Sequence, residues 1–334
     1  MDCQIDAKNA PILLQSPSDQ SVVRVFPDEW MNPIRVSEIP QLAAKRDVEL
    51  EYRIIRVLTE NERMNTRLYT DAAAKIKNRY RDMIPYTDNR VKLTDGGYIN
   101  ASYMINGLGT NRKAFIASQG PLKTTITDQW DMIWNEGIFS ILTIGKLAEG
   151  TTEKIALYWP EHVGDVLKPE GGNWSIECSS ECEVSSGLWK RELTLTNISS
   201  CSKRQICHFH FVAWPDHGSV PPATMEVLAS LVKYERSTHP DSPMLVHCSA
   251  GVGRTGTVLA MANCVEIVES QLKQNGGNLS ECWLSVMTTV LNLRECRVHI
   301  VERTWQYQSI YEAIEDLVKQ HKNGNTEMIP LRSW

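Results

Sequence analysis

The sequence predicts an α/β fold, in which a twisted mixed β-sheet is flanked by α-helices. Strand-like segments bounded by turn residues fill the middle of the chain, whereas helical spacing of apolar residues dominates the last third. The apolar run 244–246 leads through a glycine-bearing loop into an apolar-periodic helix from about Thr255. Strands joined to helices in this way indicate a sheet with helices packed on its faces.

The expected elements follow from residue spacing and turn chemistry. Five prolines punctuate the polar segment 1–45, so we expect an extended arm with a short helix near 39–46. Residues 47–77 have a charged helical pattern, in which Ile54 and Ile55 belong to an apolar stripe. Strands are expected at about 114–118, 139–144, 155–158, 174–183, 188–196 and 205–212. Helices are expected at 223–236, from about 255, at 279–294 and at 304–320.

Composition and charge are those of an ordinary soluble globular protein. Of the 334 residues, 42% are hydrophobic and 22% are charged, and the formal net charge is −5. This balance argues against a general binder of nucleic acid or of anionic membranes. No stretch approaches the roughly 18 apolar residues of a membrane span, and residues 1–4 carry no signal pattern. Nine cysteines without a framework spacing predict reduced thiols, and therefore a cytoplasmic protein.

The chain has no internal repeat and no low-complexity linker. We therefore expect one main domain over 46–320, preceded by an N-terminal extension (1–45) and followed by a C-terminal tail (321–334).

The most informative segment is 244–256, which reads Met-Leu-Val-His-Cys-Ser-Ala-Gly-Val-Gly-Arg-Thr-Gly. Backbone N–H groups of a glycine-bearing turn and the dipole of a helix N-terminus together favour a bound anion. Cys248 lies at the mouth of this turn, where such a field stabilises a thiolate. Arg254 adds a planar guanidinium that suits a tetrahedral oxyanion, so the segment predicts a nucleophile aimed at a phosphoryl group. The residues expected to line the anion site are Ser249, Ala250, Gly251, Val252 and Gly253.

Cys-x5-Arg-Thr preceded by His resembles the signature of the protein tyrosine phosphatases, and further motifs in that family's order extend the resemblance over 77–318. The resemblance implies the family's α/β fold and a reaction through cysteinyl phosphate, with no metal and no cofactor. It also implies catalytic positions at His247 and at Thr255, the latter aiding departure of the thiolate. A buried cysteine before an ordinary phosphate-binding turn is the alternative that a bare Cys-x5-Arg would leave open.

Asn-Arg-Tyr-Arg-Asp at 78–82 resembles the substrate-recognition loop of that family. The resemblance implies that Tyr80 stacks on the phenyl ring and that Asp82 accepts backbone N–H groups of a bound peptide, with Arg81 between them. The deep cleft that Tyr80 would wall admits phosphotyrosine and leaves the shorter phosphoserine unable to reach Cys248. An ordinary half-buried tyrosine is the alternative for Tyr80.

Trp-Pro-Asp-His-Gly at 214–218 matches the mobile acid loop of the family. A tyrosine leaving group needs a proton as its P–O bond breaks, so we expect Asp216 to act as acid and then as base toward water. The nearby Cys207, His208 and His210 lack an accompanying Cys-x2-Cys pair, so we expect no metal site there.

Glu149 and Lys154 align with a family loop whose lysine contacts the closed acid loop. Glu153 is an alternative to Glu149 in this alignment. Ordinary solvated charges on the surface are the alternative for the whole assignment.

One departure from the family pattern lies near the C-terminus. The register of Arg297 and of Gln306 places Glu302 and Arg303 where the family motif Val-Gln-Thr-x-x-Gln-Tyr has glutamine and threonine. That glutamine orients the hydrolytic water, whereas an ionised glutamate only accepts hydrogen bonds and adds charge beside a phosphocysteine. We expect a slow second step, unless Glu302 points away and Gln306 alone holds the water.

The sequence therefore predicts hydrolysis of phosphotyrosine in proteins, with Cys248 as nucleophile, Arg254 as phosphate clamp and Asp216 as general acid and base. Expected partners are phosphotyrosine-containing proteins, with no nucleic acid and no membrane span, and we expect a monomer. One alternative is a module that captures phosphotyrosine substrates and turns over slowly, motivated by Glu302. A dual-specificity phosphatase is the other alternative, and the Tyr80 loop disfavours it.

Overall fold

The computed structural model describes residues 33–42, 46–215 and 218–334. Nine strands form one sheet in the order β2-β3-β4-β12-β5-β11-β10-β9-β8. These strands are β2 Arg90–Lys92, β3 Tyr98–Met104, β4 Phe115–Ser118, β5 Ser140–Ile144, β8 Val166–Leu167, β9 Trp174–Ser185, β10 Leu188–Asn197, β11 Lys203–Phe211 and β12 Met244–His247. Pairing is parallel among β4, β12, β5 and β11 and antiparallel elsewhere, so the sheet is mixed as expected.

Two small two-stranded sheets and a set of helices complete the described part of the fold. The small sheets pair β1 Ile34–Arg35 with β13 Trp283–Leu284, and β6 Ala148–Glu149 with β7 Thr152–Glu153. The helices are α1 Ile39–Leu42, α2 Val48–Thr59, α3 Glu62–Asn65, α4 Ala72–Lys75, α5 Ile126–Asn135, α6 Pro222–Thr238, α7 Gly253–Gln274, α8 Val286–Cys296 and α9 Thr304–Gln320. Short 3-10 turns lie at Val36–Glu38, Lys123–Thr125 and Leu279–Glu281.

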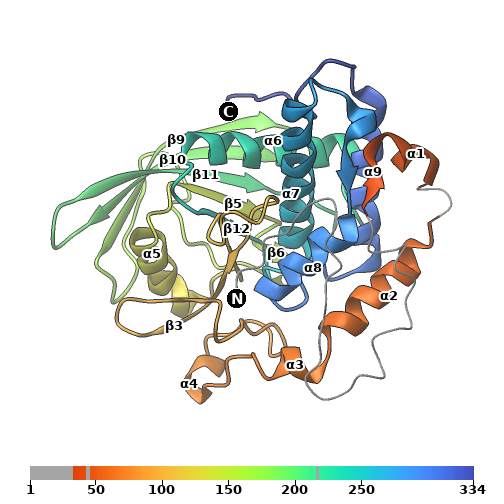
Figure 1. The fold of residues 1–334 in the computed structure, drawn as a ribbon. Helices are drawn as coiled ribbons and strands as arrows, with labels where there is room; N and C mark the ends of the chain where they lie inside the picture. The colour runs from red at the N-terminus through yellow and green to blue at the C-terminus, as the bar shows by residue number, and fades with distance from the viewer. Residues whose placement is uncertain (1–32, 43–45, 216–217) are drawn as a thin grey trace.

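Two hydrophobic cores lie on the two faces of the sheet. Residues of α2, α6, α7, α8 and α9 form the larger core with Phe115, Leu142 and Val246. The smaller core packs α5 and the segment 155–159 against the other face. Figure 1 shows α6 and α7 over one side of the strands and α5 apart from them. The strand β12 lies between β4 and β5, is buried along its whole length, and ends at His247.

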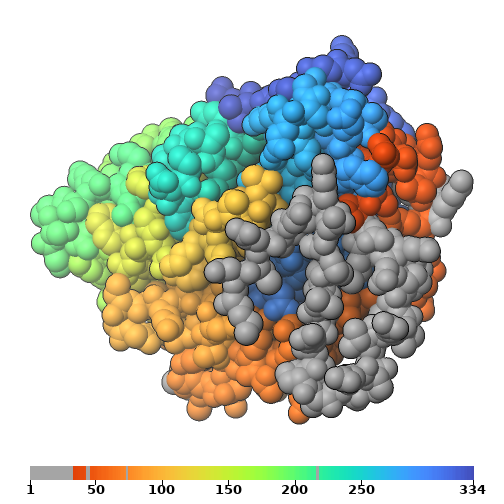
Figure 2. Space-filling view, in the orientation of Figure 1, coloured from red at the N-terminus to blue at the C-terminus, as the bar shows by residue number. Residues whose placement is uncertain are grey.

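Both flanks of the expected main domain pack against it where they are described. Val36 and Ile39 are buried in the larger core, and β1 pairs with β13 from the far end of the chain. Figure 2 shows this meeting of red N-terminal and blue C-terminal atoms on one face. In the tail, Met328 and Ile329 are buried, and their backbone N–H groups donate to the Glu269 carboxylate at 2.8 and 3.1 Å.

Most expected elements are confirmed to within a few residues, and three are wrong. The expected helical segment 47–77 is divided into three helices. The helix α2 ends at Thr59, Asn61 caps the start of the short helix α3, and the short helix α4 follows. The expected strand 155–158 is a buried loop, held by the N–H of Ile155 on Leu147 O and that of Ala156 on Pro121 O. The expected helix 279–294 begins only at Val286, where the Ser285 side chain accepts from Thr288 N.

Across the described ranges, none of the helices combines the length and the apolar character that crossing a membrane requires.

Candidate active site

The segment after β12 forms the expected loop between a strand and a helix. Cys248 follows the strand directly, is 4% exposed, and its Sγ accepts a hydrogen bond from the N–H of Gly251 at 3.3 Å. Gly251 has φ +70°, and a Cβ there would lie 2.0 Å from the carbonyl oxygen of Ser118. Only glycine satisfies both the left-handed backbone and the close approach. The helix α7 begins at Gly253, two residues earlier than expected.

Four consecutive carbonyl groups of this loop are bound by donors from the surrounding protein. Ser249 O accepts from Gly120 N at 2.9 Å, and Val252 O accepts from Val301 N at 3.1 Å. The Arg297 guanidinium supplies the other two bonds, from Nε to Gly251 O at 2.8 Å and from a terminal nitrogen to Ala250 O at 3.1 Å. Because these carbonyls point into the protein, the amides of the loop can converge on an anion.

Arg297 is fully buried, and it also donates to Asn100 Oδ1 at 2.7 Å and to Ser102 Oγ at 3.1 Å. Burial lowers the pKa of Arg297 to about 10, so the guanidinium stays charged at neutral pH. A fixed positive charge therefore lies beneath the loop, at a residue that the sequence analysis used only to set a register.

His247 anchors the backbone of the cysteine. Its Nδ1 lies 3.2 Å from Cys248 O, and its Nε2 lies 2.7 Å from the Tyr158 hydroxyl and 2.9 Å from Thr143 Oγ1. Burial lowers the pKa of His247 to about 4, so the imidazole is neutral and carries one N–H. A carbonyl can only accept, so Nδ1 donates to Cys248 and Nε2 accepts from Tyr158.

Tyr158 belongs to a segment that the sequence analysis left without any chemical role. Burial raises the pKa of Tyr158, which keeps its hydroxyl as the donor to His247.

Arg254 links the loop 248–254, called the phosphate loop below, to the acid loop at 214–218. A terminal nitrogen of Arg254 lies 2.9 Å from Glu149 Oε1 and 3.3 Å from Pro215 O. Lys154 Nζ lies 3.5 Å from the other oxygen of Glu149. The structure brings Glu149 and Lys154 together beside Arg254, and the contact of Lys154 with the closed acid loop stays a prediction. Asp216, the expected acid, lies outside the described residues.

Tyr80 lies beside the phosphate loop. Its hydroxyl is 2.8 Å from Ser249 Oγ, which in turn donates to Lys154 O at 2.9 Å. The side chain of Arg79, the residue before Tyr80, ties this segment to the loop at 120–121 by donating to Gly120 O at 3.1 Å and to Pro121 O at 2.6 Å. The neighbouring Arg81 and Asp82 are exposed.

Thr255 is completely buried, and its hydroxyl oxygen has no hydrogen-bond partner among the described residues.

Glu302 and Gln306 both face the phosphate loop. From the position that a Cβ on Gly253 would take, Gln306 Nε2 is 2.6 Å and Glu302 Oε2 is 3.1 Å away. Glu302 therefore does not point away from the loop.

The histidines beside the acid loop have partners within the sheet. His208 Nε2 lies 3.0 Å from Thr143 Oγ1, and His210 Nε2 lies 2.8 Å from Gly145 O. Over the ranges that the structure describes, His, Cys, Asp and Glu side chains do not gather in a group that could hold a metal ion.

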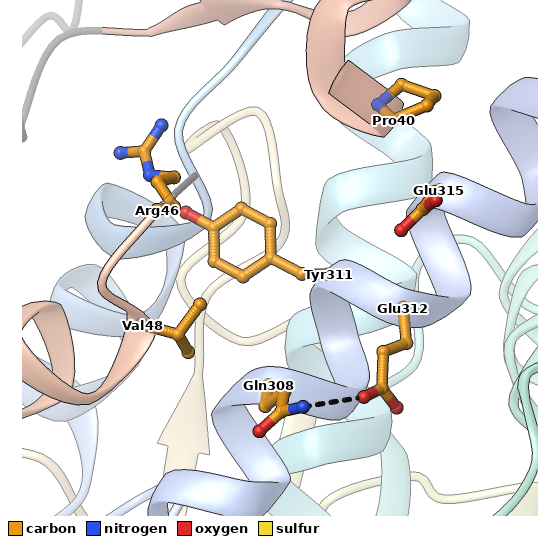
Figure 3. Close-up of a pocket in the computed structure, with 7 residues that line it drawn as sticks. All are labelled: Pro40, Arg46, Val48, Gln308, Tyr311, Glu312 and Glu315. Carbon is orange, nitrogen blue, oxygen red and sulfur yellow. Dashed lines mark hydrogen bonds between the residues drawn. The ribbon is translucent and has the colours of Figure 1, made fainter. Parts of the chain in front are cut away.

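A cavity of about 360 Å³ lies elsewhere, between the N-terminal segment and α9 (Figure 3). Its floor includes the Tyr311 ring, whose hydroxyl donates to the buried Glu51 at 3.0 Å. The lining residues are Pro40, Arg46, Val48, Gln308, Tyr311, Glu312 and Glu315. Since none of them belongs to the phosphate loop, this cavity is separate from the Cys248 site.

The structure thus places a buried cysteine in a glycine-bearing loop between a central parallel strand and the N-terminus of a helix, an arrangement suited to binding an anion. The family model for protein-tyrosine phosphatase matches residues 74–316. The chain belongs to the protein-tyrosine phosphatase family.

Similar proteins carry that family's name. The receptor-type tyrosine-protein phosphatase eta of Gallus gallus is 36% identical over 263 residues, which cover 76% of this chain and 17% of the relative. The non-receptor type 2 enzyme of Homo sapiens is 34% identical over 255 residues, covering 75% of this chain and 58% of the relative. The non-receptor type 13 enzyme of Homo sapiens is 36% identical over 200 residues, which cover 60% of this chain and 8% of the relative. This chain thus spans less than a fifth of the length of the eta relative.

Proposed function

We propose that this chain hydrolyses phosphotyrosine in proteins through a cysteinyl-phosphate intermediate. The observation that carries the proposal is the phosphate loop, in which four consecutive carbonyls are bound from behind while Cys248 Sγ accepts from the N–H of Gly251. Preorganised N–H groups of this kind stabilise charge on transferring oxygens without reorganising during the reaction.

In the first step, the Cys248 thiolate attacks phosphorus, and the P–O bond to tyrosine breaks as Asp216 gives its proton to the leaving oxygen. Arg254 and the amides of 249–253 bind the phosphoryl oxygens. In the second step, water attacks phosphorus and Asp216 takes its proton. The S–P bond then breaks, its electron pair returns to Cys248, and the Thr255 hydroxyl donates a hydrogen bond to the departing thiolate. The buried hydroxyl of Thr255 supports this role, because no described residue engages it.

The pocket wall supports phosphotyrosine as the substrate class. Tyr80 is held against Ser249, so its ring can wall a cleft whose floor is Cys248. We assign Asp82 and Arg81, both exposed, to the peptide backbone and the rim. Lys154, close to Glu149, would contact the closed acid loop.

Phosphate release from a phosphotyrosine peptide, compared with its phosphoserine counterpart, tests the proposal. We expect release from the phosphotyrosine peptide alone, inhibition by vanadate, and no loss of activity with a chelator. Cys248→Ser should abolish turnover yet retain phosphopeptide binding, because a hydroxyl without a base is a weak nucleophile. The exposed Cys201 supplies the matched control, so Cys201→Ser should be fully active. Undiminished turnover by Cys248→Ser would refute the assignment.

A second candidate is a module that captures phosphotyrosine substrates and turns over slowly. The position of the Glu302 carboxylate over Gly253 favours it, since a negative group there opposes hydrolysis of an anionic intermediate. This candidate is favoured if phosphate is released far more slowly than the phosphopeptide binds and dissociates.

We also propose a cytoplasmic monomer with a catalytic domain over 46–320. The eight cysteines of the described part are all free, which supports a reducing compartment. Residues 33–42 and 321–334 would be flanking segments that pack on this domain. Sedimentation of the full chain tests the monomer, and limited proteolysis tests the domain limits.

A further inference from the structure

A hydroxyl on β5 contacts the same nitrogen of His247 that Tyr158 contacts. Thr143 Oγ1 lies 2.9 Å from His247 Nε2, and the Tyr158 hydroxyl lies 2.7 Å from it. The register of β12 on β5 pairs His247 with Thr143, so the sheet itself fixes this approach. All three side chains are fully buried, so bulk water does not reach the nitrogen. A bare imidazole nitrogen has one lone pair, and two hydroxyl donors therefore compete for it.

His208 decides where the proton of the Thr143 hydroxyl can go. Burial lowers the pKa of His208 well below its usual range, so its imidazole is neutral and carries one N–H. Its Nε2 lies 3.0 Å from Thr143 Oγ1, whereas its Nδ1 has no partner among the described residues. A buried N–H without an acceptor is costlier than a bare nitrogen without a donor, so the proton lies on Nε2 and is donated to Thr143. The Thr143 proton is thereby free for another acceptor.

Two acceptors are within reach of that proton. Thr143 Oγ1 lies 3.1 Å from the Tyr158 oxygen and 2.9 Å from His247 Nε2. While Tyr158 donates to His247, Thr143 donates to the Tyr158 oxygen, so that each of these protons has an acceptor. Hydrogen bonds linked in this way polarise one another. The last of them runs from His247 Nδ1 to Cys248 O at 3.2 Å, so the hydroxyls act on the backbone of the nucleophile.

Resting on the proposed function, we propose that Thr143 is a second positioning residue for His247. When the Tyr158 hydroxyl is absent, the Thr143 O–H turns to His247 Nε2 and replaces it as the donor, while His208 continues to donate to the Thr143 oxygen. The carbonyl of Cys248 is then still held by a polarised N–H. The site therefore tolerates the loss of either hydroxyl, but not of both.

¹⁵N NMR spectra of the imidazole rings test the donor directly, because the shift of a bare ring nitrogen depends on whether it accepts a hydrogen bond. In Tyr158→Phe and in Thr143→Val, we expect His247 Nε2 to remain hydrogen-bonded. In the double variant, the Nε2 signal should move to the position of a free imine nitrogen. Thr143→Ser combined with Tyr158→Phe should keep the hydrogen-bonded signal, since serine retains the hydroxyl.

Hydrolysis of a phosphotyrosine peptide gives an independent readout. Each single variant should keep kcat/KM within about twofold, whereas the double variant should lose about tenfold, the effect of roughly one buried hydrogen bond.

Thr289 and Tyr311 provide a matched control pair. Both are buried, and their hydroxyls donate to separate acceptors, Ser285 O at 3.0 Å and the Glu51 carboxylate at 3.0 Å. Thr289→Val and Tyr311→Phe should therefore have additive effects on urea unfolding, and their combination should lose no more kcat/KM than the two single variants together.

A free Nε2 in Tyr158→Phe alone would overturn the proposal, and so would a hydrogen-bonded Nε2 in the double variant. The spectrum of Tyr158→Phe alone decides the question if the double variant does not fold. Failure of the wild type to release phosphate from a phosphotyrosine peptide would instead refute the proposed function, because the ¹⁵N signals of His247 do not depend on turnover.

Discussion

Arg297 offers the most direct test of how the phosphate loop is held. Its planar guanidinium bonds two loop carbonyls at 2.8 and 3.1 Å, a fork that a lysine ammonium cannot reproduce. Arg297→Lys should therefore keep a positive charge under the loop but free the carbonyls of Ala250 and Gly251. With a hydrogen bond to a charged group contributing about 1.5–3 kcal/mol, two lost bonds destabilise the protein by roughly 3–6 kcal/mol at most.

The second effect of Arg297→Lys should be on catalysis. Carbonyls released from the guanidinium can turn, and the amides of the loop then no longer converge on the phosphoryl oxygens. Losing one preorganised donor typically costs about 10²–10³-fold in rate, so we expect a fall in kcat/KM of at least about 10²-fold. Urea unfolding and kcat/KM with a phosphotyrosine peptide, both at a temperature where the variant is folded, separate the two effects.

Arg204 supplies a matched control for this experiment. It too donates to two backbone carbonyls, Ile133 O at 3.0 Å and Trp134 O at 2.9 Å, but these lie at the end of α5. Arg204→Lys should lower stability and leave kcat/KM of the folded protein unchanged. A loss of kcat/KM in Arg297→Lys no larger than that in Arg204→Lys would refute the reasoning.

Three further predictions concern the acid, the pocket entrance and pH. Asp216→Ala should slow aryl phosphates with poor leaving groups by about 10²–10⁴-fold and those with good ones less; an equal loss on both would indicate a structural role. His299 follows Arg297 by two residues, at a position that the resemblance to the family associates with a small residue where a second phosphate pocket exists. The His299 imidazole should crowd that route, so peptides with one phosphotyrosine should react as well as tandem ones, and a strong tandem preference would contradict this. The pKa of His247 falls from 6.5 to about 4 on folding, so the unfolded chain binds the extra proton between these values and stability declines as pH falls through them. At about pH 5 the loss from His247 alone should be roughly 2 kcal/mol in urea unfolding, and equal stability at about pH 5 and pH 7 would exclude it.

The contiguous part of the site could be predicted from the sequence because its chemistry is local. Cys248, Gly251 and Arg254 lie within one turn whose backbone conformation and dipole follow from residue type. The motif at 78–82 indicates Tyr80, and the structure brings its hydroxyl within 2.8 Å of Ser249 Oγ, while its stacking on a substrate ring stays a prediction. Asp216 stays a prediction.

The supporting contacts could not be predicted in the same way, because they join distant segments. Tyr158 meets His247 across 89 positions, and Arg297 meets Gly251 across 46. No local spacing encodes such pairs, and Tyr158 lies in an apolar run that reads as a strand. The tertiary contacts of Ile155 with Leu147 instead fix this run as a buried loop. The orientation of Glu302 likewise depended on the fold, since it is set by the bonds of Val301 and Gln306.

The central claim is that phosphate is carried on Cys248. Acid quenching during turnover of a phosphotyrosine peptide, followed by peptide mapping with mass spectrometry, measures this directly. We predict that the phosphate is found on the peptide containing Cys248 and that Cys248→Ser abolishes it. Phosphate trapped on another residue, or phosphate release in Cys248→Ser at the wild-type rate, would contradict the account.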